Sequence, residues 1–538
     1  MDRDQLPGRR RDAAVAVALI GVLAMGVLAR VLATGQPVFS DEFLILGNVW
    51  DFIQHHTIIP EHTKYPALYS YMAAPVTAAF FAASVLRGMP PSVYDVSEWS
   101  AYAPELAMWP ARLVSVACWC VCAWAVYRLA TEMLERRGSG LLAAAGFGGA
   151  LGTLEYSGYG LPDVAMMMWL ALALVQAARV ARRQRPRRSA LLAGLFAGLA
   201  TATKYTAVAL ALPLLVAAAL AADSWPRRLR LLGTMAGWGV AAFLVGCPGW
   251  LLAPGHYWQG LAYEGAHMAR GHLGMMGVPV LGQLELLVTA DPALVPLALV
   301  GLVLLAARGR HSDPGWPVLA AAALAVFAMA APARKQSLQY LFGLYPVLAV
   351  AVACGAVGSG GVRRAYRRLC AAVLVASAAC GLFWGYRVAM VPDSLAVARQ
   401  WLNARLPDDA VVSVDWIDVP RLVEKEEVDA LTEDLRTERV RRLYAGLRTF
   451  AGRDMQYTES FLRDTDADWI VTSSTAYARF FEFGRFTRLP PPPGSGLAPQ
   501  FEQRHRFYRT LFDGAWGWEK AYEVCTGNGP TVRVFTRR

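Results

Sequence analysis

Long apolar runs recur between residues 12 and 391 of this 538-residue chain and stop after Val391. An α-helix needs roughly 20 apolar residues to cross the hydrocarbon core of a bilayer, where its backbone polar groups pair within the helix. The composition agrees, with 56% hydrophobic residues, 17% charged residues and a mean hydropathy of +0.34. Such values exclude an ordinary soluble enzyme and predict a polytopic α-helical membrane protein.

Eleven transmembrane spans are expected from these runs. The first run follows a basic segment, so a cleaved signal peptide is an alternative to a retained anchor. Its length and the lack of a clear small-residue cleavage site favour the anchor. The predicted spans cover residues 13–33, 110–133, 139–155, 163–180, 189–203, 206–222, 229–252, 293–307, 316–331, 340–357 and 369–391.

Basic residues indicate the orientation, because short loops rich in Lys and Arg stay on the cytoplasmic side of a membrane. Every second loop carries such a segment, namely the N-terminus and residues 136–137, 182–188, 227–230, 308–310 and 363–368. If the apolar stretch 67–86 counted as a further span, the later basic loops would all lie outside the cytoplasm. This stretch is therefore expected to lie in the membrane interface or to form a re-entrant segment. The N-terminus is therefore predicted inside, and residues 34–108 form a large first external loop.

Two domains are expected. Residues 1–391 form the transmembrane domain, whose second large external loop covers residues 253–292, and eleven crossings place residues 392–538 outside the cytoplasm. The composition of this second part is that of a small soluble α/β domain. Its predicted elements are a helix at residues 394–406, a charged helical stretch at 423–450, and strands at 410–416, 467–474 and 531–538.

The net charge of +11 does not indicate a nucleic-acid partner, because its excess belongs to the apolar part of the chain. Residues 1–391 carry 31 basic and 19 acidic side chains, whereas residues 392–538 carry 21 and 22. Basic loops beside a membrane face anionic lipid headgroups, and no base-reading motif occurs. The eight cysteines form neither a disulfide framework nor a zinc-binding pair.

Lysine is rare in this chain, and its placement is informative. Of five lysines, the three in the apolar part are Lys64, Lys204 and Lys335, and all map to the predicted outer face. A single lysine there could reach lipid headgroups with its charged end. Three together, with Arg334 beside Lys335, instead favour a site for a lipid-linked phosphate, whose oxygens ammonium and guanidinium groups neutralise.

Acidic residues accompany these cations on the same face. Asp41 and Glu42 follow the first span, where they either cap a helix in a solvated loop or supply a carboxylate base. Adjacent acids diverge, so one of the two is expected to face the site, and Asp41 is preferred. Asp163 follows Pro162 at the outer end of the fourth span, as a helix-dipole partner or as a functional acid.

Histidines gather in the two external loops, among them His62 in the first and His256 and His267 in the second. The segment "HHTIIPEH" could bind a divalent metal, but its spacing matches no strong zinc signature, so no metal or other cofactor is expected. Interfacial polar side chains are the simpler interpretation of these residues. A role in binding acceptor or sugar stays open.

Several segments in this order resemble the GT-C superfamily of glycosyltransferases, and more narrowly the bacterial relatives of protein O-mannosyltransferases and the lipid A aminoarabinose transferase. They are "SDE" after the first span, "KYPALYSY", "LPD", "GLATATKYTA" and "QYLFGLYP". The resemblance covers about residues 10–391, and the tail is similar to the C-terminal domain of many bacterial members. It implies transfer of a sugar, usually with inversion, from a polyprenyl-phosphate donor to an acceptor on the outer face.

By motif position, the resemblance implies that Asp41 is the catalytic carboxylate, Lys64 a ligand of the donor phosphate and Asp163 a second acid of the site. Arg334 and Lys335 would be further phosphate contacts, and Lys204 is expected from its place on the same face to help stabilise the departing phosphate. Tyr65 stands before Pro66 where many members have histidine, so contacts to acceptor or sugar differ there. The implied partners are the lipid-linked sugar, membrane lipids and an unknown acceptor, in the inner membrane of a bacterium. A lipid-linked saccharide transporter and a non-catalytic lipid-binding relative are the alternatives.

Overall fold

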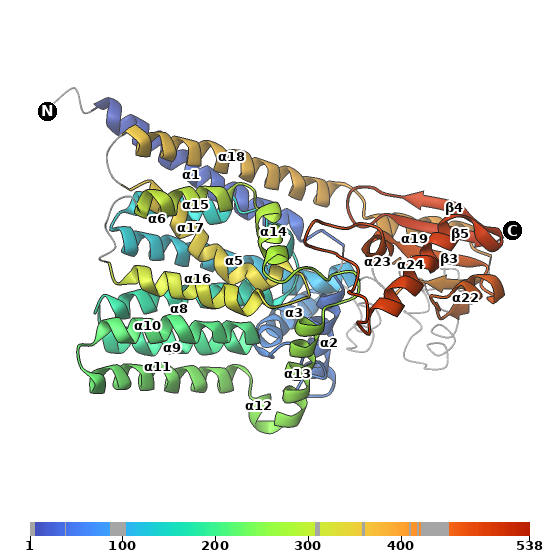
Figure 1. Ribbon diagram of the computed structural model, residues 1–538, viewed down its shortest axis with the longest axis horizontal. Coiled ribbons are helices and arrows are strands. Elements are labelled where there is room, and N and C mark those ends of the chain that lie inside the picture. The colour runs from blue at the N-terminus through green and yellow to red at the C-terminus, as the bar shows by residue number, and fades with distance from the viewer. Residues whose placement is uncertain are drawn as a thin grey trace.

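The computed structural model in Figure 1 describes residues 6–37, 39–86, 104–306, 313–357, 361–407, 410–416, 419–420 and 451–537. Up to Met390 the described chain is almost entirely helical, and the part that follows combines helices with a five-stranded sheet. Long helices run side by side through the first part, and the sheet lies beyond one end of this bundle (Figure 1).

Helices occur at each of the eleven predicted spans. They are α1 (Leu6–Ala33), α5 (Pro104–Leu134), α6 (Arg137–Gly148), α8 (Pro162–Ala181), α9 (Pro186–Thr203), η2 with α10 (Tyr205–Leu210, Ala211–Ala221), α11 (Trp225–Gly246), α15 (Leu294–Ala306), α16 (Gly315–Ala330), η3 with α17 (Leu338–Leu344, Tyr345–Gly355) and α18 (Gly361–Met390).

By length and composition, six helices among the described residues can cross a membrane. A seventh span results if α15 and the preceding α14 (Leu281–Ala290), bent by 104° at their junction, count as one. Shorter apolar helices such as α16 make up further parts of the bundle. The chain is therefore a multi-pass membrane protein. The count of eleven spans, and the side of the membrane on which each terminus lies, stay predictions.

Shorter elements close one end of the bundle. The apolar stretch expected to avoid crossing forms α3 (Leu68–Leu86), which packs on α2 (Ser40–Gln54) and α5. The second external loop contains α13 (Pro254–Arg270), the short α12 (Gly249–Leu252) lies just before it, and α7 (Leu154–Ser157) precedes α8. In Figure 1, α2, α3, α13 and α14 lie at the end of the bundle that faces the sheet. The loops between the long helices thus build a layer between bundle and tail.

The sheet of the C-terminal part has the order β2-β1-β3-β5-β4. Strands β2, β1 and β3 are parallel, and β5 runs antiparallel to both of its neighbours. The predicted helix and the three predicted strands are present, as α19, β1, β3 and β5, while the stretch 423–450 lies outside the described residues. The elements are α19 (Ser394–Arg405), β1 (Val411–Val414), β2 (Ala451–Arg453), α22 (Glu459–Asp464), β3 (Trp469–Ser473), α23 (Ser474–Tyr477), η5 (Ala478–Phe480), α24 (Ala498–Phe512), η6 (Ala515–Gly517), β4 (Trp518–Val524) and β5 (Val532–Arg537).

Hydrogen bonds attach this C-terminal part to the bundle. The buried side-chain amide of Asn528 donates to the carbonyl oxygens of Val388 and Val391, at 2.9 Å each, where α18 ends. Farther along, the backbone N–H of Val278 donates to the carbonyl of Phe486 at 2.8 Å. The tail is therefore held both by the last span and by the loop that precedes α14.

Candidate functional site

Asp41 lies in the first turn of α2, at the end of the bundle that faces the tail. One carboxylate oxygen accepts a hydrogen bond from Lys64 Nζ at 3.1 Å, and the other accepts one from the Tyr65 hydroxyl at 2.8 Å. Lys64 and Tyr65 belong to the segment between α2 and α3, which turns back over the start of α2. The side chains of Asp41 and Lys64 remain 20% and 21% exposed, so the ion pair can be reached from outside.

The three lysines of the bundle meet around two tyrosine rings. Lys64 Nζ and Lys204 Nζ lie 5.4 and 5.5 Å from the centre of the Tyr65 ring. Lys204 Nζ and Lys335 Nζ each lie 5.9 Å from the centre of the Tyr340 ring. The structure thus brings together three cations that are far apart in the sequence, as their predicted location on one membrane face suggested. Such a set can neutralise a phosphate group.

Asp163 and Lys204 form the buried side of this cluster. Lys204 directly follows α9 and Asp163 lies in the first turn of α8, and their side chains meet with 2.5 Å between Nζ and Oδ1. Both are almost completely buried. The second oxygen of Asp163 is also buried and has no hydrogen-bond partner among the described residues. A buried oxygen without a partner is costly unless a bound group satisfies it.

Glu42 points away from the lysines. Its carboxylate is completely buried and receives hydrogen bonds from Arg112 Nε and Nη2, at 2.9 and 2.7 Å, and from the backbone N–H of Gly160 and Phe39. Arg112 also binds the carbonyl oxygens of Thr34 and Gln36. The two adjacent acids diverge as expected, and the contacts of Glu42 hold the chain between α1 and α2, so its carboxylate does not face the lysines.

The charges of the cluster act on one another. Burial raises the pKa of the Asp41 carboxyl, but the Lys64 ammonium and the Tyr65 hydroxyl outweigh it, and the net pKa lies below its ordinary value. Burial lowers the pKa of Lys64, but Asp41 and Glu264 raise it above the usual range. Burial, together with the charge of Lys64, lowers the pKa of Lys335 to about 8. The Lys335 ammonium therefore loses its proton more easily than the Lys64 ammonium does.

The histidines named from the sequence separate in the structure. His267 stacks on Tyr263 and contacts His272, whose Nε2 lies 3.1 Å from a guanidinium nitrogen of Arg479 in the tail. Burial and the charge of Lys335 lower the pKa of His267 to about 4, so its ring is neutral near the lysines. His256 instead lies 3.2 Å from the carbonyl oxygen of Pro60, and the backbone of His62 pairs with Asn48.

One further residue of the site, an acid of the second external loop, was missed by the sequence interpretation. Glu264 of α13 accepts a hydrogen bond of 3.4 Å from the Tyr340 hydroxyl, and its other carboxylate oxygen is buried without a partner among the described residues. A signal existed, because Glu264 is an acid in the second external loop, close to His267. Arg334 is exposed and joins Met268 and Gly277 through its backbone. Nowhere in the described ranges do three or more His, Cys, Asp or Glu side chains form a group that could hold a metal ion.

Comparison with known proteins gives the context of this site. The family model described as dolichyl-phosphate-mannose-protein mannosyltransferase matches residues 103–251, a segment that includes Asp163 and Lys204. ArnT from Cupriavidus metallidurans, solved bound to undecaprenyl phosphate, is 15% identical and superposes with a TM-score of 0.51, covering 96% of this chain and 97% of that chain. The chain resembles the GT-C glycosyltransferases.

A second GT-C structure supports the same fold. The oligosaccharyltransferase of Archaeoglobus fulgidus in its apo form is 13% identical, with a TM-score of 0.51, and the match covers 95% of this chain and 80% of that chain. No curated protein matches the sequence. At identities of 13% and 15%, the TM-scores of 0.51 indicate a similar fold and nothing finer, and a fold alone does not determine a substrate.

Proposed function

We propose that this protein transfers a sugar from a polyprenyl-phosphate donor to an acceptor at the outer face of the membrane. The observation that carries the proposal is the Asp41 carboxylate, bound to Lys64 and Tyr65 beside two more lysines. A carboxylate next to converging cations suits the two demands of this reaction, a base for the acceptor and a site for the departing phosphate. The GT-C fold supports the same class of reaction.

The donor phosphate would be bound by Lys64 and Lys335, with Lys204 behind them. Lys64 and Lys335 lie beside different tyrosine rings, Tyr65 and Tyr340, and Lys204 reaches both rings. A phosphodiester placed between them gains charge-assisted hydrogen bonds, and these strengthen as negative charge develops on the departing phosphate. The lysines would thus stabilise the transition state more than the bound donor.

Asp41 would act as the base that takes the proton of the acceptor. In the free protein Lys64 neutralises Asp41 and keeps its pKa low, which makes the carboxylate a weak base. When the donor phosphate competes for Lys64, this ion pair weakens and the basicity of Asp41 rises. Donor binding would therefore prepare the base, and the acceptor attacks the anomeric carbon from the face opposite the phosphate, with inversion.

The unpartnered buried oxygens of Asp163 and Glu264 would face the sugar. Each lies within the cluster of lysines and tyrosines, and each can accept a hydrogen bond from a hydroxyl or amino group. The neutral ring of His267 and the side chain of Tyr65 offer further contacts. These residues would position the sugar rather than exchange protons with it, because the base function belongs to Asp41.

The experiment is transfer of radiolabelled sugar from a panel of polyprenyl-phosphate sugars to a cell-envelope extract. Wild type is compared with Asp41→Asn, Lys64→Ala and the control Asp223→Asn, whose exposed carboxylate pairs with Arg183 outside the site. Loss of a general base costs about 10²–10⁴-fold in rate. We expect this loss in Asp41→Asn with the donor still bound, weaker donor binding in Lys64→Ala, and normal transfer by the control.

Donor binding is measured in parallel by native mass spectrometry of the same proteins. Transfer at the wild-type rate by an Asp41→Asn protein that binds donor normally would refute the assignment of the base. A wild type that binds labelled lipid but consumes none of the donors would favour the alternatives, a lipid-linked saccharide transporter or a non-catalytic lipid-binding protein.

A further inference from the structure

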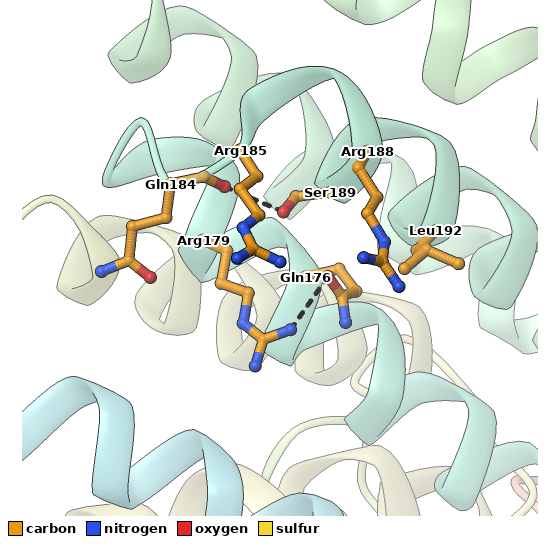
Figure 2. A pocket seen from close by; sticks show the side chains of 7 residues that line it. All are labelled: Gln176, Arg179, Gln184, Arg185, Arg188, Ser189 and Leu192. Carbon is orange, nitrogen blue, oxygen red and sulfur yellow. Dashed lines mark hydrogen bonds between the residues drawn. The ribbon is translucent and has the colours of Figure 1, made fainter.

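A second basic site lies where α8 ends and α9 begins. A pocket of about 540 Å³ is lined there by the residues drawn in Figure 2, namely Gln176, Arg179, Gln184, Arg185, Arg188, Ser189 and Leu192. Its volume falls within the range of about 300–1,000 Å³ typical of ligand pockets. Figure 2 shows the side chains of Arg179, Arg185 and Arg188 extending to the same side, around Gln176.

This pocket is remote from the lysine cluster. Helix α9 begins beside the pocket and ends just before Lys204, and α8 carries Asp163 in its first turn and Gln176 and Arg179 in its last turns. The 18 residues of α9 cover about 27 Å at a rise of 1.5 Å per residue. That length is close to the thickness of the hydrocarbon core, and the neighbouring α8 is long and apolar enough to cross a membrane, so the two sites are expected at opposite membrane surfaces.

The charge of the pocket is not balanced by nearby acids. Neighbouring arginines have carboxylate partners, since Arg182 pairs with Asp313 and Arg183 with Asp223. Within the pocket, Arg179 binds Glu132. Across the part of the chain that the structure describes, Arg185 and Arg188 make no ion pair with a carboxylate. Two uncompensated guanidinium groups therefore share one cavity with the partly neutralised Arg179.

The polar lining is arranged for an oxyanion. Gln176 and Ser189 are more than nine-tenths buried. The Ser189 hydroxyl donates to the Gln184 carbonyl at 3.0 Å, whereas the Gln176 carbonyl accepts a hydrogen bond from Arg179 at 3.4 Å, which leaves the Gln176 amide group as a donor. The start of α9, at Arg185, has no side-chain cap. Its positive dipole end thus adds to the field of the arginines.

We propose that this pocket binds a phosphate-bearing anion, whose source is the headgroup of an anionic phospholipid in the adjacent leaflet. Planar guanidinium groups bind phosphate oxygens in pairs, which a single point charge cannot do. The predicted orientation places the pocket at the cytoplasmic surface, where anionic lipids attract basic segments. Leu192 supplies an apolar wall beside the headgroup. The site is independent of the transferase site and of its proposed function.

The test uses the full chain, purified in detergent and loaded with phosphatidylglycerol, with phosphatidylcholine or with inorganic phosphate alone. Native mass spectrometry measures the retained lipid, and equilibrium dialysis of radiolabelled phosphate measures the free anion. The variant Arg185→Gln with Arg188→Gln removes the pocket charges. The control Arg187→Gln with Arg227→Gln removes two exposed charges from the same basic loops without altering the pocket lining.

We expect wild type and control to retain phosphatidylglycerol. The pocket variant should retain about tenfold less of this lipid than the control does. Retention of phosphate but not of lipid, with the same dependence on Arg185 and Arg188, would assign the site to a free phosphate compound. Equal retention of both probes by the pocket variant and the control would overturn the proposal, and so would the absence of binding by wild type. If the double variant melts earlier than wild type, the single variant Arg188→Gln replaces it.

Discussion

Lys335 is the residue of the candidate site whose charge depends on pH near neutrality. Its pKa of about 8 means that the ammonium is charged below this pH and neutral above it. We expect the affinity for a polyprenyl-phosphate sugar, a phosphodiester of constant charge, to fall as the pH rises from about 7 to about 9.5. In Lys335→Arg the decrease should disappear, because a guanidinium group keeps its charge.

The measurement is donor binding across this pH range for both proteins, with thermal unfolding followed at each pH as a control for loss of structure. A decrease in affinity with the same midpoint in Lys335→Arg would show that another group titrates.

A second prediction for a single residue concerns Glu42 and the stability of the folded protein. Replacing it by Gln leaves the buried guanidinium of Arg112 without its counter-charge. Breaking a buried ion pair from one side costs about 3–5 kcal/mol, whereas an exposed pair is worth about 0–1 kcal/mol. We therefore expect Glu42→Gln to lower the unfolding temperature clearly, and Asp223→Asn, from an exposed pair, to leave it nearly unchanged. Equal unfolding temperatures of both variants would contradict the structural role given to Glu42.

At the scale of elements, the packing of α9 on α11 depends on small residues. Gly194 and Gly198 lie one turn apart on α9 and approach the backbone of α11 at Met235 and Gly239. A Cβ at Gly198 would collide with the carbonyl oxygen of Gly239. Because this atom belongs to the backbone, it cannot move aside as the end of a flexible side chain could. Membrane helices associate closely through such pairs of small residues.

Gly198→Ala is therefore expected to destabilise the protein by about 1–3 kcal/mol through overpacking, although alanine favours helix over glycine by about 1 kcal/mol. The matched control is Gly237→Ala on α11, where a Cβ meets no heavy atom within 4 Å. Thermal unfolding in detergent compares the two variants. A higher unfolding temperature for Gly198→Ala than for wild type would mean that helix propensity outweighs the contact.

At the scale of the whole molecule, Asn528 links the tail to the bundle. Its amide group is buried and satisfies the carbonyl oxygens of Val388 and Val391 at the end of α18. In Asn528→Ala both carbonyls lose this donor, which costs about 1–3 kcal/mol. We expect faster hydrogen exchange in residues 386–396 and a lower unfolding temperature.

The control for this variant is Gln500→Ala on the exposed surface of α24. Unchanged exchange of residues 386–396 in Asn528→Ala would indicate that the tail is held by its other contacts, such as the bond between Val278 and Phe486.

The sequence by itself determined the helical bundle, because apolar runs long enough to cross a bilayer leave helices as the available structure. It also determined α19, β3 and β5 of the tail, whose apolar patterns are local. The lysines could be assigned to one end of the bundle for the same reason, since each lies where a run begins or ends. Asp41 and Asp163 were named from their positions and from a family resemblance.

Only the tertiary structure decided which charges meet. Asp41 and Glu42 are neighbours in sequence, but the turn of α2 directs one to Lys64 and the other to Arg112, a residue 70 positions away. Glu264 joins the site because the fold brings α13 within hydrogen-bonding distance of Tyr340 in η3. The arginine pocket likewise needs the ends of two helices side by side. Pairing of buried charges depends on the packing of distant segments, which a local pattern of residues does not contain.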